Sequence, residues 1–253
     1  MADHEIAMLT SGEVLAKARD QVHRQIAAFT RRADRNVEAV RVRLTTYRQT
    51  KATRPALTQV NLVVDGRPVR AQLAAGFFAE ATALLRTRLQ QQLRRLAAPA
   101  APRSWPDAFD RYRRPALAAL PPARRRVMRR KAYPLVRCGP DEAALTMDLM
   151  DYDFMLFVDA ETGQDSLVHR VGPTGYRLTR LAGLVPPGQP VRMPWTIGVA
   201  AVPRISVEEA VDRLNATDLP YRFFEDATTG RGSVLYLRYD GHYGLLTAAG
   251  STP

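Results

Sequence analysis

Arginine clusters are the residues of this sequence best suited to a chemical task. Arg124-Arg125-Arg126 and Arg129-Arg130-Lys131 place six cations within eight residues. Nearly all the cations are arginine, since the only lysines are Lys17, Lys51 and Lys131. The planar guanidinium binds phosphate through two parallel hydrogen bonds and stacks on bases, so this bias favours RNA as the ligand. A GC-rich genome also favours arginine over lysine, but it does not explain why the arginines cluster.

Side chains that could perform catalysis or bind a metal are not grouped in the sequence. The four histidines lack metal-ligand spacing, and no glycine-rich phosphate loop or nucleophile elbow is present. The acidic pairs Asp141-Glu142 and Glu208-Glu209 stand where helices are expected to begin, and the helix dipole favours acid there. We therefore expect a protein that is not an enzyme and that has no cofactor, no metal site and no small-molecule substrate.

The net charge of +12 is divided unevenly along the chain. Residues 1–98 carry a net charge of +9, residues 99–131 carry +8, and residues 132–253 carry −5. A basic front half and a mildly acidic back half imply a polyanionic partner for the first and a different partner for the second.

Composition also indicates the compartment. A single cysteine, Cys138, permits no intrachain disulfide, which fits a reducing environment. The first residues lack a basic segment followed by an apolar core, and no stretch approaches the roughly 20 apolar residues that span a bilayer. We expect a cytoplasmic protein without a membrane partner.

The first 98 residues show the pattern of a small α+β domain. An apolar stripe at spacings of three and four predicts a helix that buries Leu15, Ala18, Val22, Ile26 and Phe29. Period-two alternation predicts strands at 37–47, 57–64 and 69–75, with an Asp65-Gly66 hairpin between the last two, and a second helix follows at 77–96. With a short strand at 5–10, the order is β-α-β-β-β-α, in which two helices cover one face of a four-stranded sheet.

Residues 99–130 are rich in proline and arginine and lack apolar periodicity, which indicates a basic linker. Two interpretations remain open for its charge run. It is either a solvated tether or an arm that folds on RNA, in which case the binding residues include Arg124, Arg125, Arg126, Arg129 and Arg130.

The back half contains an internal repeat with a spacing of 67 residues, in units at 131–183 and 190–253. Asp159-Ala160-Glu161-Thr162-Gly163 recurs as Asp226-Ala227-Thr228-Thr229-Gly230, and Asp151 recurs as Asp218. Each unit is predicted to be a small α+β domain, near the lower size limit for independent folding. We expect the two units to pair within the chain as a pseudo-dimer, with an interface formed by Phe154, Leu156, Tyr221 and Phe223.

Taken together, the β-α-β-β-β-α front and the repeat resemble the long-type ribosome hibernation promoting factors. The second repeat carries the resemblance best, through Glu208-Glu209-Ala210, Arg222-Phe223-Phe224, Ser233-Val234-Leu235-Tyr236 and Asp240-Gly241-His242-Tyr243-Gly244-Leu245. The first repeat departs at its end, where Gly175-Tyr176-Arg177-Leu178 replaces the Gly-x-Tyr-Gly-Leu pattern of the second. Two copies in place of one are also a departure, similar to an actinobacterial subgroup.

The resemblance implies a bacterial ribosome as partner, with the N-terminal domain in the decoding cleft of the 30S subunit against 16S rRNA, where it blocks mRNA and tRNA. It further implies that helix arginines contact the RNA. The expected set comprises Lys17, Arg19, Arg24, Arg31, Arg32, Arg35, Arg88, Arg94 and Arg95, together with the linker arginines.

In single-copy relatives, the C-terminal domains of two chains pair and join two ribosomes. The tandem copies here are expected to pair with each other, so that the factor stores inactive ribosomes as single 70S particles. An alternative remains, in which the chain regulates a structured RNA or a transcription component that is not the ribosome.

Overall fold

The computed structural model describes residues 5–47, 53–98, 109–113, 120–172, 175–183, 188, 192–217 and 219–249. The chain divides into two compact units. The N-terminal unit comprises 1–99, 106–118 and 148–152, and the C-terminal unit comprises 100–105, 119–147 and 153–253. Much of the predicted linker, at 99–108 and 114–119, lies outside the described residues, as does Asp218.

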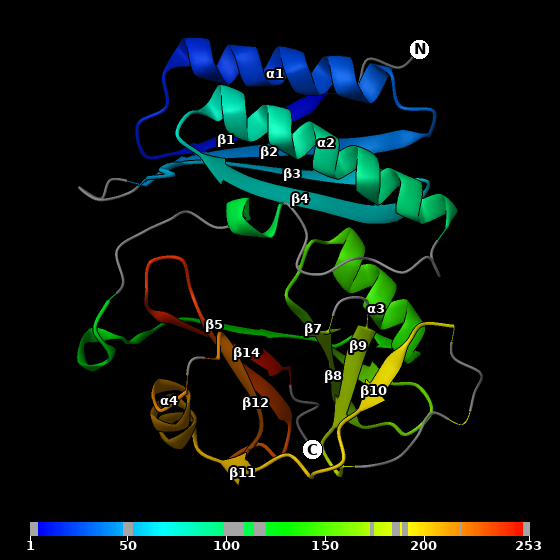
Figure 1. Ribbon diagram of the computed structural model, residues 1–253, viewed down its shortest axis with the longest axis vertical. Helices are drawn as coiled ribbons and strands as arrows, with labels where there is room; N and C mark the ends of the chain where they lie inside the picture. The colour runs from blue at the N-terminus through cyan, green and yellow to red at the C-terminus, as the bar shows by residue number, and fades with distance from the viewer. Residues whose placement is uncertain are drawn as a thin grey trace. The chain divides into compact units, whose positions relative to one another are not determined.

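The N-terminal unit has the predicted β-α-β-β-β-α order. Its elements are β1 (Ile6–Ser11), α1 (Ala16–Arg31), β2 (Val37–Thr46), β3 (Ala56–Val64), β4 (Arg67–Ala75) and α2 (Phe78–Ala97). The sheet has the order β1-β2-β3-β4, with β1 parallel to β2 and the other pairs antiparallel. Both helices cover the same face of this sheet (Figure 1), which confirms the predicted fold class.

Local sequence explains these elements. In β2, Val40, Val42 and Leu44 are buried while the intervening Arg41 and Arg43 are exposed, as period-two alternation requires. The β3–β4 hairpin turns at Asp65 and Gly66, whose φ angles of 49° and 73° lie in the left-handed region that Asp and Gly tolerate.

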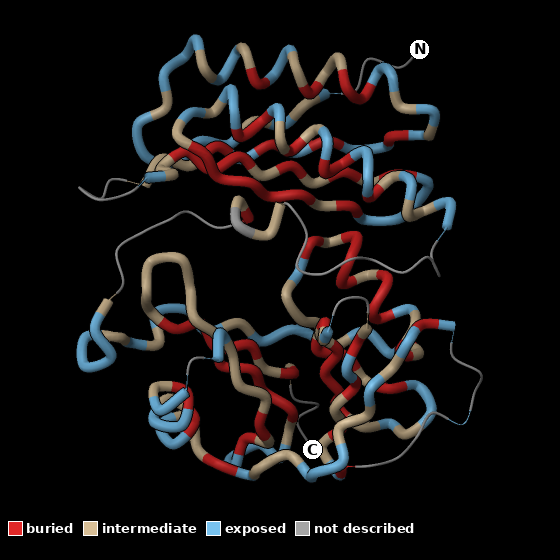
Figure 2. The backbone as a smooth tube through the Cα atoms, viewed as in Figure 1, coloured by how far each residue is buried: buried red, intermediate tan, exposed pale blue. Residues whose placement is uncertain are grey.

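The core of the N-terminal unit lies between the helices and the sheet. Val22, Ile26 and Phe29 of α1 and Leu85 and Leu89 of α2 are buried there. Strands β3 and β4 are buried along most of their length (Figure 2). Among the described residues, no helix is both long and apolar enough to cross a membrane.

The C-terminal unit contains two five-stranded sheets, one for each repeat. The first has the order β10-β9-β8-β7-β6, formed by Trp195–Ile197, Gly175–Arg180, Asp165–Val171, Phe154–Asp159 and Arg137–Cys138. The second has the order β11-β12-β13-β14-β5, formed by Arg204–Ile205, Tyr221–Asp226, Gly232–Leu237, Tyr243–Ala248 and Val127–Tyr133. Helix α3 (Pro140–Leu149) belongs to the first repeat and α4 (Val207–Asn215) to the second.

Each repeat gives one strand to the other repeat's sheet. Strand β5 precedes the first repeat in sequence but pairs in parallel with β14 of the second. Strand β10 lies near the start of the second repeat but pairs in parallel with β9 of the first (Figure 1). The structure therefore differs from the predicted boundaries. Strand β5, which begins at Val127, extends into the predicted linker, and Trp195–Ile197 belong to the predicted second unit but lie in the sheet of the first.

The acidic pairs at the two helix starts have structural roles. Ser206 and Glu209 form a reciprocal capping box at the start of α4, which confirms the interpretation of that pair as a cap. Asp141 instead accepts hydrogen bonds from the Trp195 indole at 2.8 Å and the Arg192 backbone N–H at 2.7 Å. Asp141 thus holds the residues around the exchanged strand β10 against α3.

Candidate RNA-binding surface

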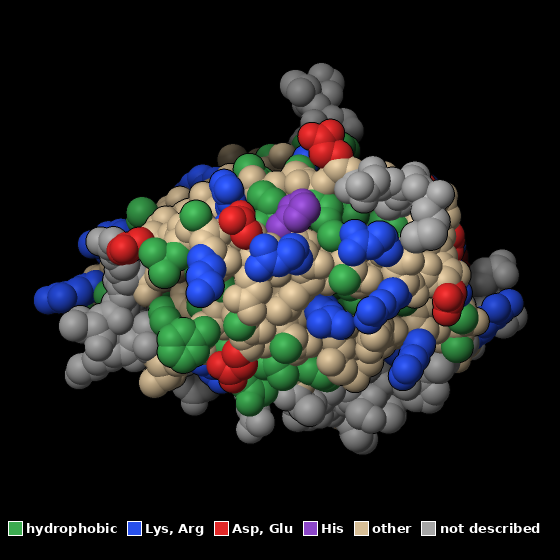
Figure 3. All heavy atoms as spheres, turned by 90° about the horizontal axis from the view of Figure 1, so that it is seen from above, with side chains coloured by type: hydrophobic (Ala, Val, Ile, Leu, Met, Phe, Trp, Pro, Cys, Tyr) green, Lys and Arg blue, Asp and Glu red, His purple; other side chains and the backbone are tan. Residues whose placement is uncertain are grey.

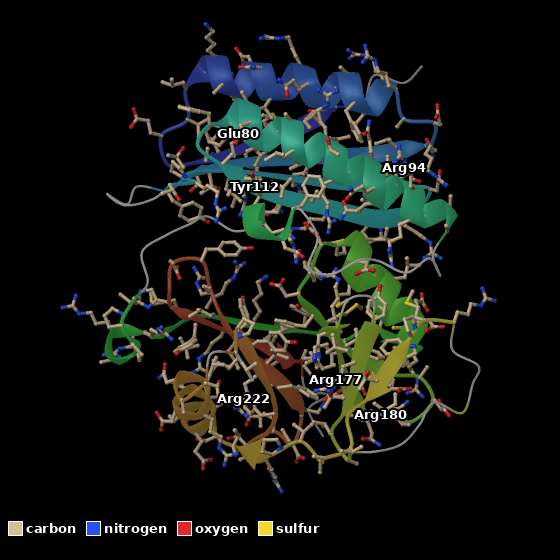
Figure 4. The ribbon with its side chains drawn as sticks, in the orientation of Figure 1. Glu80, Arg94, Tyr112, Arg177, Arg180 and Arg222 are labelled. Atoms are coloured by element: carbon tan, nitrogen blue, oxygen red, sulfur yellow. The ribbon has the colours of Figure 1, made fainter. Side chains whose placement is uncertain are left out.

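The helix layer of the N-terminal unit carries an exposed set of cations. Lys17, Arg24 and Arg31 recur every seven residues along α1 and are all exposed, because this face lies away from the buried stripe. Arg94 is exposed near the end of α2 (Figure 4), and Arg19 and Arg32 are also exposed. Figure 3 looks onto this layer and shows Lys and Arg side chains spread across it, with acidic side chains scattered between them. Cations held at fixed helix positions are suited to contacts with a phosphate backbone.

Two of the predicted cations have acidic neighbours on the surface. The Arg19 Nε lies 3.4 Å from an Asp20 carboxylate oxygen, and more than half of each side chain is exposed. Such a pair contributes little to stability and leaves Arg19 available to another anion. The half-buried Arg35 donates to Asp65 Oδ2 at 2.8 Å and so supports the β3–β4 turn. Arg35 therefore has a structural role that its position in the sequence did not indicate.

Arg88, which was expected to contact RNA, is buried and does not lie on the cationic surface. Arg88 is 2% exposed, and its Nη2 lies 2.7 Å from the carboxylate of Asp151, which is also buried. The guanidinium also lies over the Phe109 ring, 5.9 Å from its centroid. Residues 148–152 and Phe109 cover this side of α2 within the N-terminal unit, which removes Arg88 from solvent.

Arg95 is also engaged by an acidic residue. Its Nη2 lies 2.8 Å from Asp148 Oδ2, and its side chain is 11% exposed. Between these two arginines, Gln92 donates to the backbone oxygens of Asp148 and Leu149. Of the three predicted cations on α2, Arg94 alone is fully available at the surface in this arrangement of the described residues.

Arg41 and Arg43 form part of a second cationic surface that the predicted set omitted. Both are exposed on β2, on the opposite side from its buried valines and therefore on the face of the sheet that the helices leave open. The paired positions on β3 are the polar Asn61 and Gln59, with Arg70 beyond them on β4. The same period-two pattern that predicted the strand contains the signal for this surface.

The cations of the predicted linker are divided between structural and exposed positions. Arg125 donates to the backbone oxygen of Leu120 at 2.9 Å and to the Tyr243 hydroxyl at 3.3 Å, so it holds the chain before β5 against the second repeat. Arg124 and Arg126 are exposed, as are Arg129 and Arg130 on β5. Because β5 is an ordered strand, Arg129 and Arg130 belong to a folded sheet edge and not to a tether.

The four residues predicted at the repeat–repeat interface lie together in one apolar cluster. Leu156, Leu167, Val234 and Leu246 form its buried part, and Phe154, Tyr221, Phe223 and Tyr236 pack against them. The Phe154 and Tyr221 ring centroids are 4.8 Å apart. This cluster is separate from the core that packs α4 against the second sheet.

Burial shifts the pKa values of Cys138 and His169, two titratable groups among the described residues of the C-terminal unit. Burial raises the pKa of the Cys138 thiol to about 12, so it stays protonated and unreactive at neutral pH. Burial and then the charge of Arg177 lower the pKa of His169 to about 4. Within the part of the chain that the structure describes, no three His, Cys, Asp or Glu residues group as metal ligands.

A family model matches both repeats, and two solved structures align with part of the chain. The model of the family "Sigma 54 modulation/S30EA ribosomal protein C terminus" matches residues 122–178 and again 199–245, once on each repeat. Among solved structures, a ribosomal subunit interface protein from Coxiella burnetii aligns with 37% of this chain and 97% of its own at 16% identity, with a TM-score of 0.30. The Thermus thermophilus Protein Y N-terminal domain aligns with 36% of this chain and 97% of its own at 23% identity, with a TM-score of 0.29.

A relative of similar length extends the comparison over nearly the whole chain. The dormancy associated translation inhibitor of Mycobacterium tuberculosis, in strains CDC 1551 / Oshkosh and ATCC 25618 / H37Rv, is 40% identical over 257 residues. The alignment covers 97% of this chain and 89% of the relative. With this identity, and with the S30EA C-terminal model matched on both repeats, the chain belongs to the family of long-type ribosome hibernation promoting factors, in the form with two tandem C-terminal domains.

Proposed function

We propose that this protein binds the ribosome and inhibits translation, with its N-terminal unit in the decoding cleft of the small subunit against 16S rRNA. Occupation of that cleft would exclude mRNA and tRNA. The observation that carries the proposal is the exposed cationic helix layer formed by Lys17, Arg24, Arg31 and Arg94. The name of the 40% identical relative, a dormancy associated translation inhibitor, supports the same function.

The cationic layer suits structured RNA for a physical reason. Each phosphate that an arginine neutralises releases condensed counterions, so affinity comes mainly from charge and falls as salt rises. Specificity then comes from the fit of a rigid cationic shape to a preformed RNA surface more than from hydrogen bonds to base edges. Helices packed on a sheet supply that rigidity, because the buried stripe of α1 fixes the direction of its cations.

The paired repeats favour storage of ribosomes as single 70S particles. The apolar cluster around Phe154 and Tyr221 is filled by the two repeats of the same chain. Strands β5 and β10 are also exchanged between these two repeats, which completes both sheets without a second chain. If two factors join through this apolar cluster, the surface that would link two ribosomes is occupied within one chain, which supports the proposal.

A structured RNA outside the ribosome is the second candidate target, because the same cations would bind it. Sedimentation distinguishes the two, since a ribosome-bound factor travels with ribosomes in lysates of starved cells. A factor that acts on another RNA stays in the light fractions.

Three exposed arginines allow a test of the cationic helix layer without loss of buried contacts. Replacing Arg24, Arg31 and Arg94 by Ala should weaken ribosome binding and relieve inhibition of translation in a cell-free system. Each lost phosphate contact should also lower the salt dependence of log Kobs by about one unit of slope. The measurement is a binding titration at several salt concentrations.

The matched control removes Arg41 and Arg43, which are equally exposed but lie on the open face of the sheet. We expect this double variant to bind nearly as tightly as the parent protein. If it loses binding while the helix variant keeps it, the open face of the sheet is the RNA-binding surface. If neither variant changes binding although both fold, the N-terminal unit does not supply the affinity.

A further inference from the structure

The contact between the two repeats has a pseudo-twofold axis that can be located from residue numbers. Phe154 and Tyr221 occupy equivalent positions in the repeats, 67 residues apart, and their rings touch. The pair Phe154–Tyr236, at 6.0 Å, is mirrored by the equivalent pair Tyr221–His169, at 5.6 Å. A residue meets its own equivalent only where a twofold axis passes between them, so the axis passes through this cluster.

A second pair of equivalent residues also meets, and here the two repeats differ. Asp165 of the first repeat corresponds to Gly232 of the second, and the Gly232 N–H donates to Asp165 Oδ2 at 2.7 Å. The neighbouring Arg231 binds the same carboxylate with two bonds, Nε to Oδ2 at 2.8 Å and Nη2 to Oδ1 at 3.0 Å. The position in the first repeat that corresponds to Arg231 is the uncharged Gln164. The Asp165 side chain is only 5% exposed, so this bidentate pair compensates a nearly buried carboxylate.

Gly232 is required by space at this contact. A Cβ at that position would lie 2.7 Å from the Asp165 Cβ and 3.1 Å from the Phe223 ring. The φ angle of Gly232 is not positive, so the glycine serves the close approach and not an unusual backbone. The first repeat thus supplies an acid, and the second supplies a space and three N–H donors.

Two identical repeats could not form this contact. Two first repeats would place Asp165 against Asp165, with crowded Cβ atoms, two facing carboxylates and no arginine between them. Two second repeats would place Arg231 beside Arg231, with no acid to bind either. Only a first repeat joined to a second repeat satisfies the carboxylate, the guanidinium and the available space together.

We propose that Asp165, Arg231 and Gly232 form a pairing code, by which each repeat binds a repeat of the other kind and rejects its own kind. The code acts in addition to the tether between the repeats. It prevents two chains from joining through two first repeats or through two second repeats. Two chains could then form a dimer only if the first repeat of each paired with the second repeat of the other. This statement concerns the protein alone, and only its bearing on ribosome dimers rests on the proposed function.

The test exchanges the residues at positions 164 and 165 with those at the equivalent positions 231 and 232. One full-length variant, Gln164→Arg with Asp165→Gly, gives both repeats the code of the second. The other, Arg231→Gln with Gly232→Asp, gives both repeats the code of the first. A four-residue exchange, which combines all these substitutions, swaps the codes and restores complementarity.

Protection against hydrogen exchange in strands β7, β8, β12 and β13 measures the pairing. Each two-residue variant should lose protection there and unfold at lower denaturant, while the four-residue exchange should recover at least half of the loss. If the four-residue exchange is as damaged as the sum of the two variants, the effect is local disruption and the code is wrong. Unchanged protection in either two-residue variant would also overturn it.

The second measurement mixes the two two-residue variants, which carry different isotope labels, and detects their complexes by native mass spectrometry. After refolding together, the two two-residue variants should form a mixed complex at twice the 28.2 kDa of one chain. This complex should exceed the self-association of either variant at least tenfold. Self-association of either variant to the same extent would show that like repeats pair freely, which contradicts the proposal. No ribosome is needed for either readout, so failure here is separate from failure of the proposed function.

Discussion

Arg88 and Arg94 stand six residues apart on α2, and the structure gives them different environments. Arg94 projects into solvent, whereas Arg88 is buried against Asp151. A helix pattern shows which residues share a face, but it does not show what later part of the chain covers that face. This is why the exposure of Arg94 could be predicted and the burial of Arg88 could not.

Arg88 is expected to stabilise the N-terminal unit. Asp151 would keep Arg113, whose Nε lies 3.3 Å from its carboxylate, but would lose the shorter contact with Arg88. Arg88→Ala should therefore lower the free energy of unfolding by about 2 kcal/mol. The exposed Arg94→Ala should change it by less than about 0.5 kcal/mol. Chemical denaturation measures both. Equal stability of the two variants would show that the Arg88–Asp151 pair does not contribute as described.

His169 should make the stability of the paired repeats depend on pH. The unfolded chain binds a proton below the ordinary pKa of 6.5, but the folded chain resists protonation until the pH approaches 4. Stability should therefore fall as pH decreases through this window, by about 2 kcal/mol at pH 5 relative to pH 7. Denaturation at both pH values should show this loss in the parent protein and a smaller loss in His169→Gln. The same loss in both would assign it to other groups.

At the scale of elements, periodicity predicted the order of helices and strands in the N-terminal unit. Leu15, which was predicted to be buried, is 70% exposed because it precedes the first residue of α1. The alternation in β2, the Asp65-Gly66 turn and the apolar stripes of both helices all lie within short stretches of sequence. The exchange of β5 and β10 was not predictable in this way, because period and propensity identify a strand but not the strand with which it pairs. Arg129 and Arg130 were assigned to a linker for this reason.

Strand β5 should be necessary for the second repeat's sheet. The Ala249 N–H donates to the backbone oxygen of Tyr133, so the backbone groups of Tyr133 face β14. Because these groups alternate along a strand, the N–H of Lys131 also faces β14, whereas the N–H of Arg130 faces away from it. Lys131→Pro should remove a ladder hydrogen bond and destabilise this sheet by about 1–3 kcal/mol. Arg130→Pro, the matched control, should cost less. Loss of hydrogen-exchange protection in β14 is the readout, and equal effects of both substitutions would contradict this pairing.

At the scale of the whole molecule, the tether and the contact between repeats both favour pairing of the two repeats within one chain. The 24 residues 184–207 separate Gly183 from Glu208, and a tether of this length gives an effective concentration on the order of millimolar. A second chain would have to compete with that concentration and with two exchanged strands. We therefore expect one factor for each ribosome, with pairing inside the chain, and no joining of ribosomes.

Sedimentation of purified ribosomes with the full-length protein tests the central claim most directly. The protein should travel with the 70S peak at low salt, leave it as salt rises, and produce no ribosome-dimer peak at any ratio of protein to ribosome. A factor that remains at the top of the gradient at low salt would contradict ribosome binding. A substantial dimer peak that disappears on deletion of residues 190–253 would contradict pairing within the chain.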